Sequence, residues 1–316
     1  MHLTKKAITE RMKDTDVVIE MLDARLPGSS ANPMLAELTA GKPGLKVLNK
    51  QDLADPACTA LWLEHYTRKP VPTGPDDIDG KISGRHAPPT QLAISLDSSD
   101  GAPGAKMVQA CRELAPHRGT VVKPLRVLIC GIPNVGKSTL INRLAGKRAA
   151  KTGDEAGVTK LEQRIALTAD FYLYDTPGML WPRIIVAKSG YNLAASGAVG
   201  RNAYDDEEVA LELADYLKSH YPGLLAARFK LTVDPNMSDE ELLQEIGRKR
   251  GALLGKGRVN VQKAAEIVIH EFRAATLGRI TLETPSEYAQ WLAAGEKADA
   301  ERQLKKTQRK LRPDKV

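Results

Sequence analysis

Short apolar runs alternate with amphipathic segments along the first 180 residues of the chain. A helical repeat with Ile8 and Met12 on one face covers residues 4–14. Apolar runs of strand length cover residues 17–22, 45–48, 91–96, 125–130 and 171–174. Strands that alternate with helices are typical of a largely parallel sheet with helices on both faces. Ligands of such sheets bind beyond the carboxyl ends of the strands, so the residues after each run are the candidates for chemistry.

The pattern changes to helical repeats after residue 182. Residues 205–220 repeat apolar side chains at helical spacing. Ser238 and Glu241 match a capping box, and Asn260 is placed to cap a further helix. We therefore expect an α/β domain over residues 1–182, a small all-helical domain over residues 183–284 and a basic tail over residues 285–316, the tail being a frayed helix or a disordered arm.

A glycine-rich loop joins the run at 125–130 to an amphipathic segment. It reads Gly-Ile-Pro-Asn-Val-Gly-Lys-Ser-Thr over residues 131–139 and matches a phosphate-binding P-loop between a strand and a helix. Backbone N–H groups of such a loop point at phosphate oxygens, and the helix N-terminus adds its positive dipole end. Lys137 is expected to reach the β- and γ-phosphates, and Ser138 to bind magnesium. The predicted nucleotide contacts are Asn134, Val135, Gly136, Lys137, Ser138 and Thr139.

Two further motifs follow strands and indicate which nucleotide binds. Residues 49–52, Asn-Lys-Gln-Asp, resemble the GTPase signature in which Asp pairs with the ring N–H and exocyclic amine of guanine. Adenine carries no donors there, so Asp52 would select GTP and GDP. Asp175 and Gly178 are the first and last residues of an Asp-Thr-Pro-Gly string. This string resembles the motif whose Asp holds magnesium through water and whose Gly N–H senses the γ-phosphate. The predicted guanine contacts are Asn49, Lys50 and Asp52.

The order of these motifs is unusual. Ordinary GTPases run from the P-loop through Asp-x-x-Gly to Asn-Lys-x-Asp, whereas here the guanine motif comes first and none follows Gly178. The simplest explanation is a circular permutation, cut after the Asp-Thr-Pro-Gly strand, with the old termini joined. The segment after Gly178, which moves when the γ-phosphate is lost, then leads directly out of the nucleotide domain.

Two additional strings make the resemblance specific. Residues 23–27 read Asp-Ala-Arg-Leu-Pro, and residues 157–159 read Gly-Val-Thr. Together with the P-loop and Asp-Thr-Pro-Gly-Met-Leu-Trp-Pro, they make the chain resemble the circularly permuted ribosome biogenesis GTPase A family over about residues 1–285. The resemblance implies a P-loop GTPase that joins the large ribosomal subunit precursor, binds its rRNA in the GTP state and leaves after hydrolysis.

The resemblance also implies roles for single residues. Thr159 matches the switch Thr that contacts magnesium in the GTP state, and Asn134 matches the P-loop Asn that helps to coordinate potassium in potassium-stimulated members. Ser95 and Leu96 resemble the loop whose backbone supports guanine, although Leu96 replaces the usual small residue. The residues expected to act in catalysis are Lys137, Thr159 and Gly178.

The chain departs from the family pattern where a catalytic helper is expected. Met179 stands where Ras-like enzymes place a water-orienting Gln, and an apolar side chain cannot position water. The family assigns this role to a His in an N-terminal Trp-Phe-Pro-Gly-His-Met segment, and that His would precede Met1. His2 is a neighbour of this position and not its match. The alternatives are a longer natural N-terminus, substitution by His2, and slow hydrolysis without a partner.

Composition limits the remaining possibilities. Aromatic residues make up 4% of the 316 residues, which argues against base-stacking platforms. The net charge of +7 favours a polyanionic partner. The three cysteines show neither disulfide nor zinc spacing, with Cys130 expected in the core. No apolar run is long enough for a membrane span, so we expect a cytoplasmic protein. We also expect it to be a monomer when it is off the ribosome. Basic residues gather at Arg248, Lys249, Arg250, Lys256, Arg258, Lys263, Arg273 and Arg279, and again at Arg302, Lys305, Lys306, Arg309, Lys310 and Arg312.

Other functions stay open on sequence alone. The basic clusters are expected to contact RNA, although a solvated helix face is the alternative. The insertion at about 69–90, rich in Pro, Gly and charge, is either a linker or an RNA contact. The missing helper leaves room for an RNA-binding scaffold that hydrolyses little GTP, and a GTPase of tRNA modification or membrane traffic is a further alternative.

Overall fold

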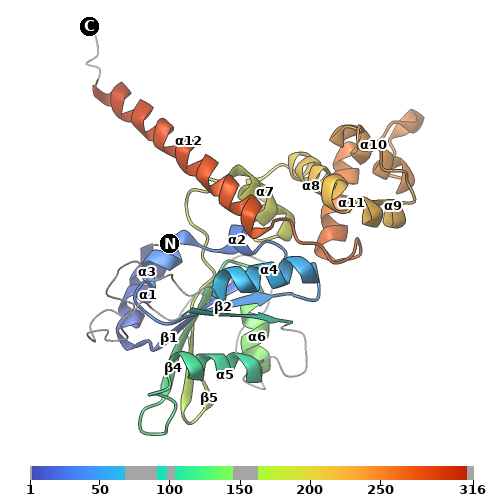
Figure 1. Ribbon diagram of the computed structural model, residues 1–316. Coiled ribbons are helices and arrows are strands. Elements are labelled where there is room, and N and C mark those ends of the chain that lie inside the picture. The colour runs from blue at the N-terminus through green and yellow to red at the C-terminus, as the bar shows by residue number, and fades with distance from the viewer. Residues whose placement is uncertain (1, 68–90, 98–103, 145–162, 312–316) are drawn as a thin grey trace, which may run out of the picture. The chain divides into compact units, whose positions relative to one another are not determined.

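The computed structural model describes residues 2–67, 91–97, 104–144 and 163–311 (Figure 1). Thr159 and the predicted insertion at 69–90 lie outside these ranges. The chain divides into two compact units. Unit 1 comprises Met1–Trp181, Ala198–Gly200 and Arg279–Thr281, and unit 2 comprises Pro182–Gly197, Arg201–Gly278 and Leu282–Val316.

Unit 1 is built on a sheet whose described strands follow the order β3-β2-β1-β4-β6-β5. Neighbouring strands are parallel except β5 and β6, which confirms the prediction of a mostly parallel sheet. Every residue of the central strand β1 is buried, so the middle of the sheet is covered on both faces. The strands are β1 (Val17–Asp23), β2 (Gly44–Asn49), β3 (Gln91–Leu96), β4 (Leu125–Gly131), β5 (Gln163–Thr168) and β6 (Phe171–Asp175).

The helices of unit 1 follow local sequence signals. The predicted helix at 4–14 forms as an α-helix that continues into a 3-10 turn at Met12–Asp14, and Ile8 packs in a core cluster with Leu128. Asn32 caps a short helix by accepting hydrogen bonds from two backbone N–H groups of its first turn. The helices are α1 (His2–Arg11), α2 (Pro27–Ser30), α3 (Pro33–Leu38), α4 (Pro56–Thr67), α5 (Gly104–Leu114) and α6 (Lys137–Leu144).

The strand order brings the three motifs to one edge of the sheet. β2 and β4 lie on either side of β1, and β6 pairs with β4. Because these strands are parallel, their carboxyl ends lie at the same edge. β2 ends at Asn49, β4 at Gly131 and β6 at Asp175. The guanine motif, the P-loop and the Asp-Thr-Pro-Gly string therefore meet in space although their order along the chain is permuted.

The described part of unit 2 is helical, apart from an isolated bridge between Leu253 and Val259. α11 packs against α7, α8 and α10, and the helix caps are those that the sequence predicted. Ser238 and Glu241 form the capping box of α10, and Asn260 caps α11. The helices are α7 (Ala187–Ser196), α8 (Asp206–His220), α9 (Pro222–Phe229), α10 (Asp239–Lys249), α11 (Val261–Arg273) and α12 (Pro285–Leu311).

The C-terminal segment, for which a frayed helix or a disordered arm was expected, is helical. α12 is a continuous helix of 27 residues from Pro285 to Leu311. Thr284 and Glu287 stabilise its start, because the carboxylate of Glu287 accepts hydrogen bonds from the N–H and the hydroxyl of Thr284. No helix in the described ranges combines the length and the apolarity that a membrane span requires.

Candidate nucleotide-binding site

The P-loop backbone has the shape that phosphate binding requires. β4 ends at Gly131 and α6 begins at Lys137. Between them, Asn134 and Gly136 have positive φ angles of 56° and 94°, a type of turn in which successive N–H groups form an anion-binding concavity. A Cβ at Gly131 would lie 2.8 Å from the carbonyl oxygen of Met21. Glycine is therefore required where the loop leaves the sheet.

Lys137 and Asp175 form a buried ion pair beside this loop. Their side chains are 6% and 0% exposed. Burial raises the pKa of Asp175 above its ordinary value, although Lys137 acts in the opposite direction. Atom Oδ2 of Asp175 is buried and accepts no hydrogen bond from the described residues. A buried carboxylate oxygen that accepts no hydrogen bond suits a cation or one of its water ligands.

The described residues fit magnesium held mainly by phosphate and water. They contain no cluster of three His, Cys, Asp or Glu residues that could hold a metal by themselves. Magnesium in nucleotide sites commonly uses one or two protein ligands and completes its shell with phosphate oxygens and water. Asp175 and the partly buried Ser138 offer oxygen atoms that suit this role, and Thr159 lies outside the described ranges.

The guanine motif is attached directly to the P-loop. The side-chain amide of Asn49 donates a hydrogen bond to the carbonyl oxygen of Val135 at 2.7 Å. The ammonium of Lys50 donates to the carbonyl oxygen of Asn134 at 2.8 Å. Asp52, whose side chain is exposed, lies two residues after Lys50. These contacts link segments more than 80 residues apart in the chain and build one site from two motifs.

The end of β3 supports the guanine motif from a second direction. Leu48 pairs with Ser95, and Asn49 pairs with Leu96, in the parallel ladder of β2 and β3. The N–H of Gln51 donates to the carbonyl oxygen of Leu96 at 3.2 Å. The loop predicted to support the base is therefore adjacent to the loop predicted to read it, and Leu96, with 4% exposure, fills the core where a smaller residue was expected.

Asp23 and Arg25 form a second buried ion pair, which sequence reasoning used only as a family marker. Atoms Nε and Nη2 of Arg25 donate to the two carboxylate oxygens of Asp23 at 3.0 and 2.8 Å, and Lys50 donates to the same carboxylate at 2.9 Å. Burial acts to raise the pKa of Asp23, but Arg25 and Lys50 outweigh it and hold that pKa well below its usual range. Asp23 thereby fixes the ammonium that reaches the P-loop.

The segment after Asp175 is held against the P-loop by backbone contacts. A Cβ at Gly178 would lie 3.0 Å from the Cα of Pro133, so a larger residue would push the two segments apart. The N–H of Met179 donates to the carbonyl oxygen of Gly131 at 3.1 Å. The side-chain amide of Asn32 donates to the carbonyl oxygen of Met179 at 2.9 Å. Asn32 thus caps α3 and anchors the segment that was predicted to respond to the γ-phosphate.

The catalytic helper is not supplied by Met179. Its side chain is 5% exposed and packs in the core cluster with Leu35 and Tyr174, which agrees with the expectation that it cannot position water. His2 begins α1, but its side chain lies outside the described residues. Cys130 is buried and forms no disulfide, as expected for a core residue.

Comparisons with known proteins agree with this geometry. Residues 126–221 match a family model described as "50S ribosome-binding GTPase". The chain is 37% identical to ribosome biogenesis GTPase A of Bacillus cereus, over 95% of this chain and 96% of that protein. It is 38% identical to the protein of the same name from Priestia megaterium, over 92% of this chain and 96% of that protein.

A solved structure shares the fold. The structure of GNP-bound YlqF from T. maritima is similar with a TM-score of 0.57 and 23% identity, and the match covers 90% of this chain and 98% of that one.

Proposed function

The chain belongs to the ribosome biogenesis GTPase A family and is a GTPase, and we propose that it assists the assembly of the large ribosomal subunit. In this proposal, the GTP-bound protein binds the subunit precursor and its rRNA, and hydrolysis lowers its affinity. The similarity to ribosome biogenesis GTPase A proteins supports the assembly role, and the hydrogen bonds that tie Asn49 and Lys50 to the P-loop carry the proposed nucleotide site. They support a single pocket that holds phosphates at one end and guanine at the other.

The residues at the phosphate end have separate tasks. The N–H groups of the P-loop bind phosphate oxygens, and Lys137 neutralises charge on the β- and γ-phosphates as water attacks the γ-phosphorus. Magnesium, held by Ser138, Thr159 and Asp175, would supply further positive charge to the same oxygens. With nucleotide bound, Lys137 exchanges part of its interaction with Asp175 for phosphate. Gly178 is proposed to donate its backbone N–H to the γ-phosphate.

The guanine end depends on Asp52. Its exposed carboxylate would accept hydrogen bonds from the ring N–H and the exocyclic amine, while the backbone of Ser95 and Leu96 supports the base. Burial raises the pKa of Asp52 somewhat.

Catalysis of the chemical step requires help from outside the described residues. The buried Met179 cannot orient water, so we propose that the immature subunit completes the site. Asn134 has a left-handed backbone conformation in the phosphate-binding loop. Potassium bound beside this residue would add positive charge near the phosphates. Single-turnover hydrolysis, measured with and without large subunits and in potassium or sodium buffers, tests both points. Equal rates in all four conditions would contradict them and favour a scaffold that hydrolyses little GTP.

The first proposed RNA contact is the basic, glycine-bearing loop of unit 2 at residues 249–258. Its exposed cations are Lys249, Lys256 and Arg258, and Lys256 has a φ of 63° between two glycines, which turns the backbone sharply at the tip. Other basic residues of the predicted cluster, among them Arg250 and Arg273, have partners within the fold. Arg250 pairs with Glu271 at 2.8 Å, and Arg273 donates to backbone carbonyl groups of α7.

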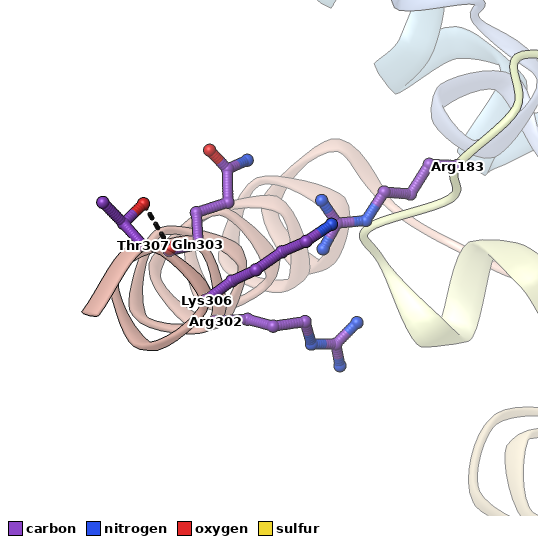
Figure 2. A pocket seen from close by; sticks show the side chains of 5 residues that line it. All are labelled: Arg183, Arg302, Gln303, Lys306 and Thr307. Carbon is purple, nitrogen blue, oxygen red and sulfur yellow. Dashed lines mark hydrogen bonds between the residues drawn. The ribbon is translucent and has the colours of Figure 1, made fainter. Parts of the chain in front are cut away.

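A second cationic surface lies where α12 passes the start of unit 2. Arg183, Arg302 and Lys306 extend toward one cavity of about 600 Å³, which Gln303 and Thr307 complete (Figure 2). Arg183 also pairs with Asp299. A cavity lined by three cations suits the phosphates of an RNA backbone, whose binding releases counterions. We propose that both surfaces of unit 2 contact rRNA.

Salt dependence tests the RNA contacts. The double variant Lys256→Glu/Arg258→Glu should weaken binding to large-subunit precursors and reduce the slope of log affinity against log salt by about 2. Lys123→Glu, which reverses an exposed charge on unit 1, is the control and should change neither quantity. An unchanged slope in the double variant would remove the loop from the RNA interface. Co-sedimentation with these precursors, rather than with tRNA, separates the proposal from a role in tRNA modification.

A further inference from the structure

The loop that carries Asp52 is held by three residues from near the end of the chain. Arg279–Thr281 belong to unit 1, although the residues on either side of them belong to unit 2. Atoms Nη2 and Nε of Arg279 donate to the carbonyl oxygens of Gln51 at 2.6 Å and Ala54 at 2.8 Å. The N–H of Ile280 donates to the carbonyl oxygen of Leu53 at 3.0 Å. Carbonyl groups on both sides of Asp52 therefore accept hydrogen bonds from this segment, here called the strap.

Thr281 extends the strap to the neighbouring strand end. Its side chain is fully buried, and its hydroxyl accepts a hydrogen bond from the N–H of Asp55 at 3.1 Å and donates to the carbonyl oxygen of Ala24 at 3.3 Å. Ile280 is 1% exposed. The strap thus connects the end of the Asp52 loop to the segment that contains the Asp23 and Arg25 pair.

The contacts to the P-loop and to β3 fix the start of this loop, at Asn49, Lys50 and the N–H of Gln51, and the strap fixes the rest. Asp52 itself is exposed, and within the loop the N–H groups of Leu53 and Ala54 make only turn contacts to Lys50 and Gln51, at 3.0 and 3.3 Å. Lys50 has a φ of 61°, an uncommon conformation for a residue with a side chain. Two hydrogen bonds to guanine demand a carboxylate held within a fraction of an ångström. Arg279 braces this loop on both sides of Asp52.

We propose that Arg279 is a positioning residue for guanine recognition, and that Thr281 assists it by anchoring the strap. The inference rests on the proposed reading of guanine by Asp52. Arg279 acts through the backbone of Gln51 and Ala54 and does not touch the base. The positive charge of Arg279 also opposes the effect of burial on the pKa of Asp52, which favours the ionised acceptor that both base donors need. Guanine selectivity therefore depends on a residue 227 positions away from the one that reads the base.

Binding of GDP and inosine diphosphate provides the test. Inosine lacks the exocyclic amine, so the ratio of the two dissociation constants measures the second hydrogen bond to Asp52. Arg279→Ala should weaken GDP binding by about tenfold, because a displaced carboxylate loses its geometry toward both donors of guanine. Inosine diphosphate offers only one of these donors, so its binding should weaken much less. Thr281→Val, of similar volume, should reduce the ratio in the same direction by a smaller factor. Arg279→Lys should restore little, because an ammonium cannot reproduce the paired Nε and Nη2 contacts.

Controls separate this inference from the proposed function. Arg112→Ala removes an arginine that bonds the carbonyl oxygen of Gly119 and the carboxylate of Asp170 elsewhere in unit 1, and it should leave the ratio unchanged. Asp52→Ala should bring the ratio of the two dissociation constants close to one. A native protein that binds GDP and inosine diphosphate equally would contradict the proposed reading of guanine by Asp52. If the native protein and Asp52→Ala behave as expected while Arg279→Ala keeps the native ratio, the positioning role is overturned. A uniform loss for both nucleotides would likewise show a general structural role.

Discussion

Removal of the Arg25 guanidinium should destabilise unit 1 without altering the residues predicted to bind phosphate. Arg25 and Asp23 are both 2% exposed and share two hydrogen bonds between guanidinium and carboxylate, of 3.0 and 2.8 Å. Methionine replaces most of the volume of arginine without charge. Arg25→Met therefore leaves the Asp23 carboxylate buried, with Lys50 as its remaining ion partner at 2.9 Å.

The magnitude follows from the burial of the pair. Breaking a buried ion pair by removing one partner costs about 3–5 kcal/mol of unfolding free energy. Because Lys50 remains in contact with the carboxylate, we expect a value near the lower end, about 3 kcal/mol. For a unit of this size each kcal/mol lowers the Tm by about 2–4 °C. The Tm of unit 1 should therefore fall by roughly 6–12 °C.

Calorimetry of the nucleotide-free protein at pH 7 measures this change. The comparison variant is Asp23→Asn/Arg25→Met, which removes both charges of the pair and leaves Lys50 with the carbonyl oxygen of Asn134 as its partner. It should recover part of the lost stability, because no carboxylate remains buried beside an apolar side chain. A Tm of Arg25→Met within about 2 °C of the native value would refute the reasoning.

The same pair predicts a pH dependence. The folded pKa of Asp23 lies below its unfolded value, which is about 3.9, because Arg25 and Lys50 outweigh the effect of burial. The stabilisation is therefore fully present above pH 4 or so and is lost as the pH falls toward the folded pKa. The difference in Tm between the native protein and Arg25→Met should stay constant from about pH 7 to pH 5 and narrow below about pH 4. A difference that widens in acid would contradict the assignment.

Three further variants test the nucleotide site by fluorescent nucleotide titration and single-turnover hydrolysis. Lys137→Ala should weaken GTP binding by more than about 100-fold, and retained affinity would count against the P-loop assignment. Asp52→Asn should weaken GDP binding by about 100-fold and improve binding of xanthosine diphosphate, whose C2 oxygen accepts from the amide; unchanged preference would remove the guanine assignment. Gly178→Ala should slow hydrolysis while GDP affinity is kept, because its Cβ would press on Pro133; a native rate would exclude a tight contact there.

The elements and motifs were predictable because their signals are local. The P-loop, the capping box at Ser238 and the cap at Asn260 each depend on residues a few positions apart, and they form as the sequence indicated. The permuted motif order was also readable, since it requires only the positions of Asp52, Lys137 and Asp175 along the chain. The roles of these residues toward nucleotide stay predictions for the variants above.

Contacts between distant segments were not predictable from patterns. Asp23 and Arg25 were recognised as part of a family string, but their ionic contact with Lys50 depends on the pairing of β1 with β2. Arg279 was counted among the basic residues expected to contact RNA. In the structure its guanidinium donates hydrogen bonds to carbonyl groups of the Asp52 loop. Charge along a sequence cannot distinguish a solvated arginine from one that bonds carbonyl groups elsewhere in the fold.

The sequence by itself determined which chemistry the chain is predicted to carry, because the side chains expected to bind phosphate, magnesium and guanine stand in short motifs with fixed spacing. It also determined where strands and helices begin, since capping and hydrophobic periodicity act over a few residues. Only the tertiary structure decided how these motifs share one site. Parallel pairing of β2, β1, β4 and β6 brings their carboxyl ends to one edge. Carbonyl groups of the Asp52 loop accept hydrogen bonds from a segment more than 220 residues away.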